Sequence, residues 1–114
     1  KLSHQKILEK CSEIKLVLTD VDGVLTDGGM YYSQNGESFK KFNTRDGMAV
    51  ELLKNNGIST IYVTKENSNS SRKRAQKTNA SIYEGIVDKK SLVLKIIKKH
   101  KISNDIYFGI CWEY

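Results

Sequence analysis

The sequence has no proline, two cysteines and a single tryptophan in 114 residues. Because proline is absent, its turns must be built from glycine, asparagine and serine. The cysteines, Cys11 and Cys111, lie far apart and have no metal-ligand spacing, which argues against a structural zinc site. So few cysteines indicate a reduced compartment, and we expect a cytoplasmic protein.

Long apolar runs are also absent. No stretch is long enough to cross a bilayer, and no charged-then-apolar signal segment opens the chain, so we expect no membrane partner. Hydrophobic residues make up 39% and charged residues 28%, which is typical of a soluble globular protein. The length predicts one domain, residues 1–114, with a modest core.

Acidic residues are fewer than basic ones, 13 against 19, so the formal net charge is +6. Much of the positive excess lies in residues 72–77 and 95–101, where helices would present solvated basic faces. Neither an aromatic stacking platform nor a recognition-helix pattern accompanies these residues, so nucleic acid is not an expected partner. Attraction of an anionic small molecule explains part of the charge equally well.

The most informative segment is residues 16–26, in which an apolar run ends in Asp20 and Asp22 and is followed by glycine. Such a run predicts a buried strand, and α/β sheets place their chemistry at the carboxyl ends of strands. Being two residues apart, the carboxylates would point the same way if the strand continued. An EF-hand loop is excluded because its later ligand positions fall on Val24 and Tyr31. A surface turn is the alternative, but it would not normally follow so apolar a strand.

Turn and periodicity signals divide the chain into alternating strands and helices. Helices are predicted near 3–11, 46–55, 68–78 and after the capping residue Asp88, strands near 14–19, 58–63, 81–83 and 105–109, and a hairpin within 28–42 that turns at 34–36. The inward faces are predicted as Met48, Ala49, Leu52 and Leu53 in the second helix and Leu92, Val93, Ile96 and Ile97 in the last. This alternation predicts an α/β fold with a parallel sheet covered by helices.

The combination of motifs resembles the haloacid dehalogenase superfamily, and within it the small capless sugar-acid phosphatases. The family pattern Asp-x-Asp-Gly-Val-x-Thr-Asp-Gly is met by residues 20–28, its aromatic hairpin by Tyr31 and Tyr32, and Phe-Asn-x-x-Asp-Gly by residues 42–47. The resemblance implies a three-layer Rossmann-like core with a parallel sheet, a β-hairpin flap and no cap domain. It covers nearly the whole chain but weakens toward the C-terminus.

The resemblance also implies roles for individual residues. Asp20 would be the nucleophile that forms an aspartyl-phosphate, and Asp22 the acid and base that serves first the leaving group and then water. Thr64 and Lys89 would hold the phosphate, with Lys90 as the competitor of Lys89 for that role. Mg²⁺ would be bound by Asp20 and by the backbone carbonyl of Asp22.

The implied substrate is a sugar-acid phosphate of lipopolysaccharide or sialic-acid-type synthesis, namely 3-deoxy-D-manno-octulosonate 8-phosphate or a nonulosonate 9-phosphate. Its contacts would come from one loop and a distal arginine: Asn43, Thr44, Arg45, Asp46, Gly47 and Arg74. For Arg74, a position on a solvated helix face is an equally good interpretation. The resemblance further implies a homotetramer in which the hairpin at 28–42 packs against neighbouring subunits.

Departures from the family pattern leave a second function open. Lys65 and Glu66 stand where glycine and often arginine are usual. No aspartate follows Gly109, Glu113 is the nearest carboxylate, and the family's last strand and helix are missing. A one-base shift of the codons for residues 110–114 can restore the family's wording, so we expect a truncated or frameshifted reading frame. The alternative function is a catalytically impaired oligomerisation module, similar to the C-terminal domain of acylneuraminate cytidylyltransferases.

Overall fold

The computed structural model describes residues 1–101 and 107–110, which form alternating strands and helices. The helices are α1 (His4–Ser12), α2 (Thr44–Asn55), α3 (Asn69–Thr78) and α4 (Lys89–Lys99). The strands are β1 (Leu16–Thr19), β2 (Tyr31–Ser33), β3 (Gly36–Phe39), β4 (Ser59–Val63), β5 (Ser81–Tyr83) and β6 (Tyr107–Ile110). Each predicted element is present with shifted ends, and residues 105–106 of the last predicted strand lie outside the described residues.

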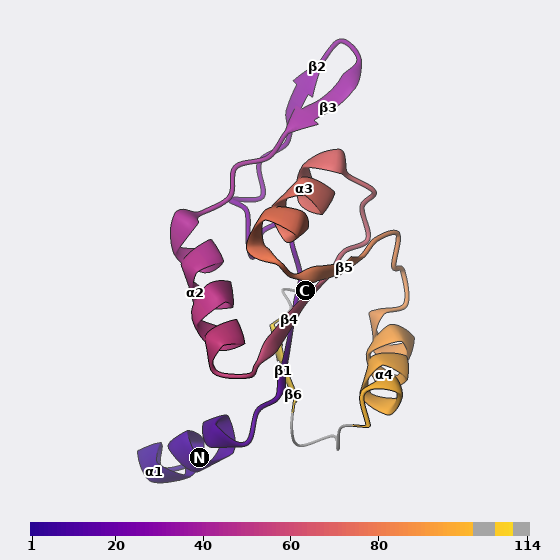
Figure 1. Ribbon diagram of the computed structural model, residues 1–114. Helices are drawn as coiled ribbons and strands as arrows, with labels where there is room; N and C mark the ends of the chain where they lie inside the picture. Colours follow the sequence, from indigo (N-terminus) through magenta and orange to yellow (C-terminus); the bar gives the residue numbers. More distant parts are fainter. Residues whose placement is uncertain (102–106, 111–114) are drawn as a thin grey trace.

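Four strands form a parallel sheet in the order β5–β4–β1–β6. The central strand β1 pairs with β4 through Leu18 and Ile61, and with β6 through Leu18 and Gly109. Figure 1 shows α4 on one side of this sheet and α2 and α3 on the other. The three layers confirm the predicted α/β fold, and no cap domain interrupts the described part of the chain.

The sheet buries one hydrophobic core on each face, because side chains alternate along its strands. The core beside α4 contains Leu16, Leu18, Ile61, Val63 and Ile96. The core beside α2 and α3 contains Val21, Val50, Tyr62 and Ala75. The inward stripe predicted for α4 is confirmed, since Ile96 and Ile97 are buried and Leu92 packs against the same core.

The inward face predicted for α2 is largely wrong. Of its four residues, Leu53 is half-buried and three are exposed: Met48, Ala49 and Leu52. The buried residue of the helix is instead Val50, which joins the core under α3. Gly47, one turn earlier, lies beside Arg74 of α3, because a Cβ on this glycine would be 2.8 Å from the arginine Nη2. Contact with the sheet and α3 therefore decides which side of α2 turns inward, and apolar residues outside that contact stay exposed.

Strands β2 and β3 form an antiparallel hairpin that projects from the body of the molecule (Figure 1). Gly36 has a φ of 106°, a conformation that favours glycine and permits the tight turn. The rings of Tyr31 and Phe39 stack with centroids 4.8 Å apart. The return strand ends at Phe39, earlier than the predicted Phe42, because the chain turns inward there and buries Lys40.

Helix α1 begins after its N-cap Ser3, whose hydroxyl accepts a hydrogen bond from the Lys6 amide. None of its residues is buried, and Ile7 and Leu8 are 46% and 52% exposed. The predicted amphipathic helix is thus present, but the described part of the chain does not cover its apolar side. Within the described ranges, no helix combines the length and the apolar character that a membrane crossing requires.

We expect Ile96→Ala to lower the free energy of unfolding by ~2–5 kcal/mol, because this core side chain is only 2% exposed. Leu94→Ala on the same helix is the matched control. Its side chain is 52% exposed, so the free energy of unfolding should fall by only about 0.5 kcal/mol. Urea unfolding followed by circular dichroism measures both losses, and equal values would contradict the packing of α4 on the sheet.

Candidate active site

The loop that carries the two aspartates is a tight turn at the carboxyl end of β1. The Val21 carbonyl accepts hydrogen bonds from three successive amides, those of residues 24–26, at 2.8–3.2 Å. The Thr26 hydroxyl in turn accepts hydrogen bonds from the amides of Gly23 and Gly28, both at 3.1 Å. These bonds close the loop on itself and fix the positions of both carboxylates relative to the sheet.

Asp20 lies against the start of α4. Its Oδ1 is 3.1 Å from Lys89 Nζ and also accepts a hydrogen bond from the Val21 amide at 2.8 Å. Both charged side chains are mostly enclosed, with exposed fractions of 13% for Asp20 and 21% for Lys89. No described residue donates a hydrogen bond to Asp20 Oδ2, so that oxygen is available to a ligand. The structure thus brings Asp20 and Lys89 together, whereas Lys90 is exposed.

Asp22 is held from two sides by residues that are distant in the sequence. Lys40 Nζ donates a hydrogen bond to its Oδ1 at 2.7 Å. The Thr64 hydroxyl, at the end of β4, donates to Oδ2 at a longer 3.5 Å and accepts a hydrogen bond from the Glu66 amide at 3.2 Å. Lys40 was not among the predicted site residues, because nothing in the local sequence pattern distinguishes it from its neighbour Lys41.

These groups line one open pocket of about 280 Å³ at the carboxyl end of the sheet: Asp20, Asp22, Thr64, Lys65, Glu66, Ile86, Val87 and Lys89. Its carboxylates are hard oxygen donors, which suit Mg²⁺ because this ion binds through one or two carboxylates and keeps several waters. In the part of the chain that the structure describes, no cluster of three or more His, Cys, Asp or Glu residues offers a fuller ligand set. The pocket therefore fits a magnesium ion shared with a bound anion better than one enclosed by protein alone.

A further acidic residue, Glu84, lies at the end of β5. It accepts hydrogen bonds from the Ser68 amide at 2.9 Å and from Arg72 Nη1 at 2.8 and 3.0 Å. Burial raises the pKa of Glu84, but the Ser68 amide, Arg72 and the more distant Lys40 together hold that pKa below its ordinary value of 4.5. From the sequence, Arg72 was predicted only as part of a basic helix face. The pair joins the start of α3 to the strand end beside the pocket.

The predicted substrate contacts lie beside this pocket and not in it. Asn43 is the N-cap of α2, where its Oδ1 accepts a hydrogen bond from the amide of the exposed Arg45 at 2.8 Å. Arg74 Nη2 donates to the Asn43 carbonyl at 2.9 Å, and its guanidinium lies 5.5 Å from the centroid of the Phe42 ring. Arg74 is therefore a contact between α3 and α2 and is not only part of a solvated face. Asn43 and Asp46 also line a smaller hollow of about 250 Å³.

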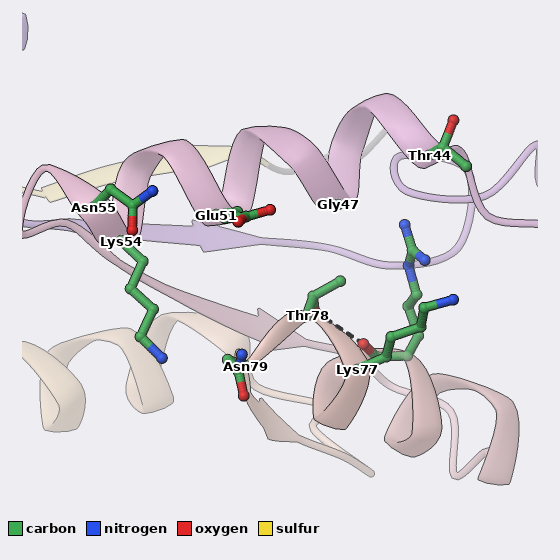
Figure 2. Close-up of a pocket in the computed structure, with 9 residues that line it drawn as sticks. Thr44, Gly47, Glu51, Lys54, Asn55, Lys77, Thr78 and Asn79 are labelled. Carbon is green, nitrogen blue, oxygen red and sulfur yellow. Dashed lines mark hydrogen bonds between the residues drawn. The ribbon is translucent and has the colours of Figure 1, made fainter.

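A larger groove of about 450 Å³ lies between α2 and α3 (Figure 2). Its lining consists of Thr44, Gly47, Glu51, Lys54, Asn55, Arg74, Lys77, Thr78 and Asn79. Three cations, Lys54, Arg74 and Lys77, outnumber the single carboxylate, so the groove is basic. Three predicted substrate contacts, Thr44, Gly47 and Arg74, thus lie in a groove whose lining shares no residue with the pocket of the two aspartates.

The segment in which the C-terminal departure from the family pattern begins is β6, which pairs with the central strand β1. Gly109 lies in β6 opposite Leu18 of β1. Cys111 and Glu113 lie outside the described residues, and so does most of the segment on which a reading-frame error was expected. That expectation stays a prediction.

Comparison with curated proteins links the chain to one group of enzymes. The 3-deoxy-D-manno-octulosonate 8-phosphate phosphatase of Haemophilus influenzae is 34% identical over 92 residues, which are 80% of this chain and 51% of the relative. The chain thus spans about half the length of this relative. No family model matches the chain.

Solved structures are similar over nearly all of the chain. The 3-deoxy-D-manno-octulosonate 8-phosphate phosphatase of Moraxella catarrhalis, in complex with magnesium, phosphate and its KDO molecule, has a TM-score of 0.87 and 31% identity. The match covers 94% of this chain and 62% of that one. The cobalt-bound Haemophilus influenzae phosphatase has a TM-score of 0.83 and 31% identity, over 88% of this chain and 59% of that one.

Acidification should weaken the fold through Glu84. Because its folded pKa is lowered, its stabilising contribution is present above the ordinary value of 4.5 and is lost as pH falls through the folded value. We expect Glu84→Gln to cost about 1 kcal/mol at neutral pH and to show a smaller further loss on acidification than the parent. Urea unfolding at neutral and acidic pH measures this, with the exposed Glu13→Gln as control. Parallel pH dependence in parent and Glu84→Gln would contradict the assignment.

Proposed function

We propose that this chain is a member of the haloacid dehalogenase superfamily and forms the core of a magnesium-dependent phosphatase for a sugar-acid phosphate. The observation that carries the proposal is the 3.1 Å contact between Lys89 Nζ and Asp20 Oδ1, in the pocket that also contains Asp22 and Thr64. A carboxylate nucleophile, a cation and a second carboxylate at one strand end are groups that phosphoryl transfer uses. We also propose a cytoplasmic location, because the sequence has only two cysteines.

In the proposed first step, Asp20 Oδ2 attacks phosphorus while the bond to the sugar oxygen breaks, which leaves an aspartyl-phosphate. Lys89 holds the other carboxylate oxygen, so it orients the nucleophile. Its ammonium is proposed to stabilise the negative charge on the transferring phosphate. Because both side chains are mostly enclosed, salt screens this interaction less than it screens a surface ion pair.

Asp22 supplies the protons in this scheme. It donates one to the sugar oxygen as that group leaves, and it later takes one from the water that hydrolyses the aspartyl-phosphate. This second step releases inorganic phosphate, restores the Asp20 carboxylate and returns Asp22 to its protonated form. The Thr64 hydroxyl, already directed at Asp22 Oδ2, is proposed to donate a hydrogen bond to a phosphate oxygen.

When bound, Mg²⁺ supplies positive charge that offsets the repulsion between an anionic nucleophile and an anionic phosphate. We propose that its protein ligands are the Asp20 carboxylate and the backbone carbonyl of Asp22. The oxygen donors of the pocket support this choice, and so does the magnesium in the similar Moraxella catarrhalis structure.

The sugar-acid end of the substrate is proposed to contact the start of α2 and Arg74 of α3. The contacts would be Asn43, Thr44, Arg45, Asp46, Gly47 and Arg74. A sugar acid carries a carboxylate, which complements the basic groove between these helices. The proposed substrate is 3-deoxy-D-manno-octulosonate 8-phosphate, on which the similar enzymes are named to act, or a nonulosonate 9-phosphate.

We expect magnesium-dependent phosphate release from 3-deoxy-D-manno-octulosonate 8-phosphate, measured as inorganic phosphate. Asp20→Asn should abolish it, because an amide is not a nucleophile for phosphorus. Asp22→Asn should lower kcat by about 10²–10⁴-fold through loss of acid and base. Asp27→Asn is the matched control, since among the described residues this exposed carboxylate of the same loop accepts a hydrogen bond only from the Gly29 amide, which an asparagine oxygen can also accept.

A folded parent chain that releases no phosphate above the Asp20→Asn level would contradict the proposed activity. If that inactive chain still assembled, the result would favour the alternative of an oligomerisation module.

The hairpin is proposed to join copies of the chain into a homotetramer. Its large apolar and aromatic side chains are exposed: Met30 by 38%, Tyr31 by 41%, Phe39 by 57% and Tyr32 by 69%. Because the hairpin projects from the sheet, a second copy can cover these rings without disturbing the core (Figure 1).

Tyr32→Lys should shift the tetramer toward smaller species, because it places a charge in the covered surface. Leu94→Lys on α4 is the control: its side chain is 52% exposed but lies away from the hairpin, so assembly should persist. Sedimentation equilibrium measures both. A parent chain that is monomeric at all concentrations, or a tetramer that tolerates Tyr32→Lys, would refute the assignment.

A further inference from the structure

Lys40 stands out because its side chain is 0% exposed, although lysine is rarely buried without an opposite charge. It follows β3 directly, and its Nζ is 2.7 Å from Asp22 Oδ1. We infer that Lys40 is a positioning residue that acts through Asp22 and orients this carboxylate for proton transfer. The inference rests on the proposed function, in which Asp22 is the acid and base.

The Lys40 contact decides which oxygen of Asp22 serves the pocket. A carboxylate turns easily about its last bond, because that torsion is broad and roughly two-fold. The short, charged hydrogen bond from Lys40 holds Oδ1. The other oxygen, Oδ2, therefore points toward the Thr64 hydroxyl, which lines the pocket 3.5 Å away. A general acid must reach the leaving oxygen within hydrogen-bond distance, so the orientation of Oδ2 controls proton transfer.

The surroundings of Lys40 suit a role in positioning better than one in binding. At the end of β3, Phe39 is 57% exposed while Lys40 is buried. The Lys40 charge also acts on Glu84, which Arg72 holds at the end of β5. The ammonium thus contacts Asp22 of the β1 loop, while its charge acts on Glu84 over a longer distance. Lys40 does not belong to the described residues that line the catalytic pocket. It contacts Asp22 outside that lining and therefore acts through this carboxylate.

Two substrates with different leaving groups test this role in the full chain with magnesium. Lys40→Met keeps the length of the side chain and removes its charge. For 3-deoxy-D-manno-octulosonate 8-phosphate, whose alkoxide leaving group needs a proton, kcat/KM should fall by about 100-fold or more. For p-nitrophenyl phosphate, whose leaving group needs little protonation, kcat/KM should fall by about tenfold or less. The exposed neighbour supplies the control, Lys41→Met, which should leave both values unchanged.

The Asp22→Asn background shows whether Lys40 acts through Asp22. There, adding Lys40→Met should change kcat/KM for p-nitrophenyl phosphate by less than about twofold, because the group being positioned is already lost. Equal losses toward the two substrates in Lys40→Met would overturn the inference. A large further loss in the double variant would do the same.

Unfolding separates this inference from the proposed function. If the parent hydrolyses neither phosphate, the proposed function fails, and the pairing is judged from urea midpoints of the parent, both single variants and the double variant. Asp22→Asn removes the carboxylate that lies 2.7 Å from the buried Lys40 ammonium, so Lys40→Met should lower the midpoint less in that variant than in the parent. Additive changes in midpoint would show that Lys40 does not hold Asp22 and would overturn the inference regardless of activity.

Discussion

Two carboxylates held side by side at the end of one buried strand are the constraint on which the rest of this structure depends. Like charges so placed repel each other, and partial burial strengthens the repulsion. Each therefore has its own cation: Lys89 Nζ lies 3.1 Å from Asp20 Oδ1, and Lys40 Nζ lies 2.7 Å from Asp22 Oδ1. The loop hydrogen bonds to Val21 and Thr26 keep the pair in place.

The fold delivers these cations from two separate elements. Lys89 is the first residue of α4, whose start is capped by Asp88 and whose other end is anchored in the core by Ile96. Lys40 directly follows β3 of the hairpin, and none of the described side chains of β2 and β3 belongs to either core. A change in the position of α4 or of the hairpin would therefore move a lysine that contacts one of the carboxylates. The hairpin's link to the site through Lys40 gives it a second role beside the proposed assembly.

The pocket and the groove divide the proposed chemistry into two regions. The pocket of about 280 Å³ contains the two aspartates, whose proposed partners are a metal ion and a phosphate. The groove of about 450 Å³ between α2 and α3 is basic and contains Arg74, which also fastens the two helices together through the Asn43 carbonyl. Arg74 thus joins a structural contact to a proposed substrate contact, and a substitution there would affect both.

The sequence by itself determined the features that depend on neighbours along the chain. The apolar run before Asp20, the cap at Asp88 and the stripe of α4 are local patterns, so the parallel sheet and the family motif were predictable. Only the tertiary structure decided which face of α2 is buried, because contact with α3 at Gly47 overrides the apolar pattern of that helix. It alone also joined Lys40 to Asp22, since a pairing across 18 residues depends on where the hairpin ends and the chain turns inward.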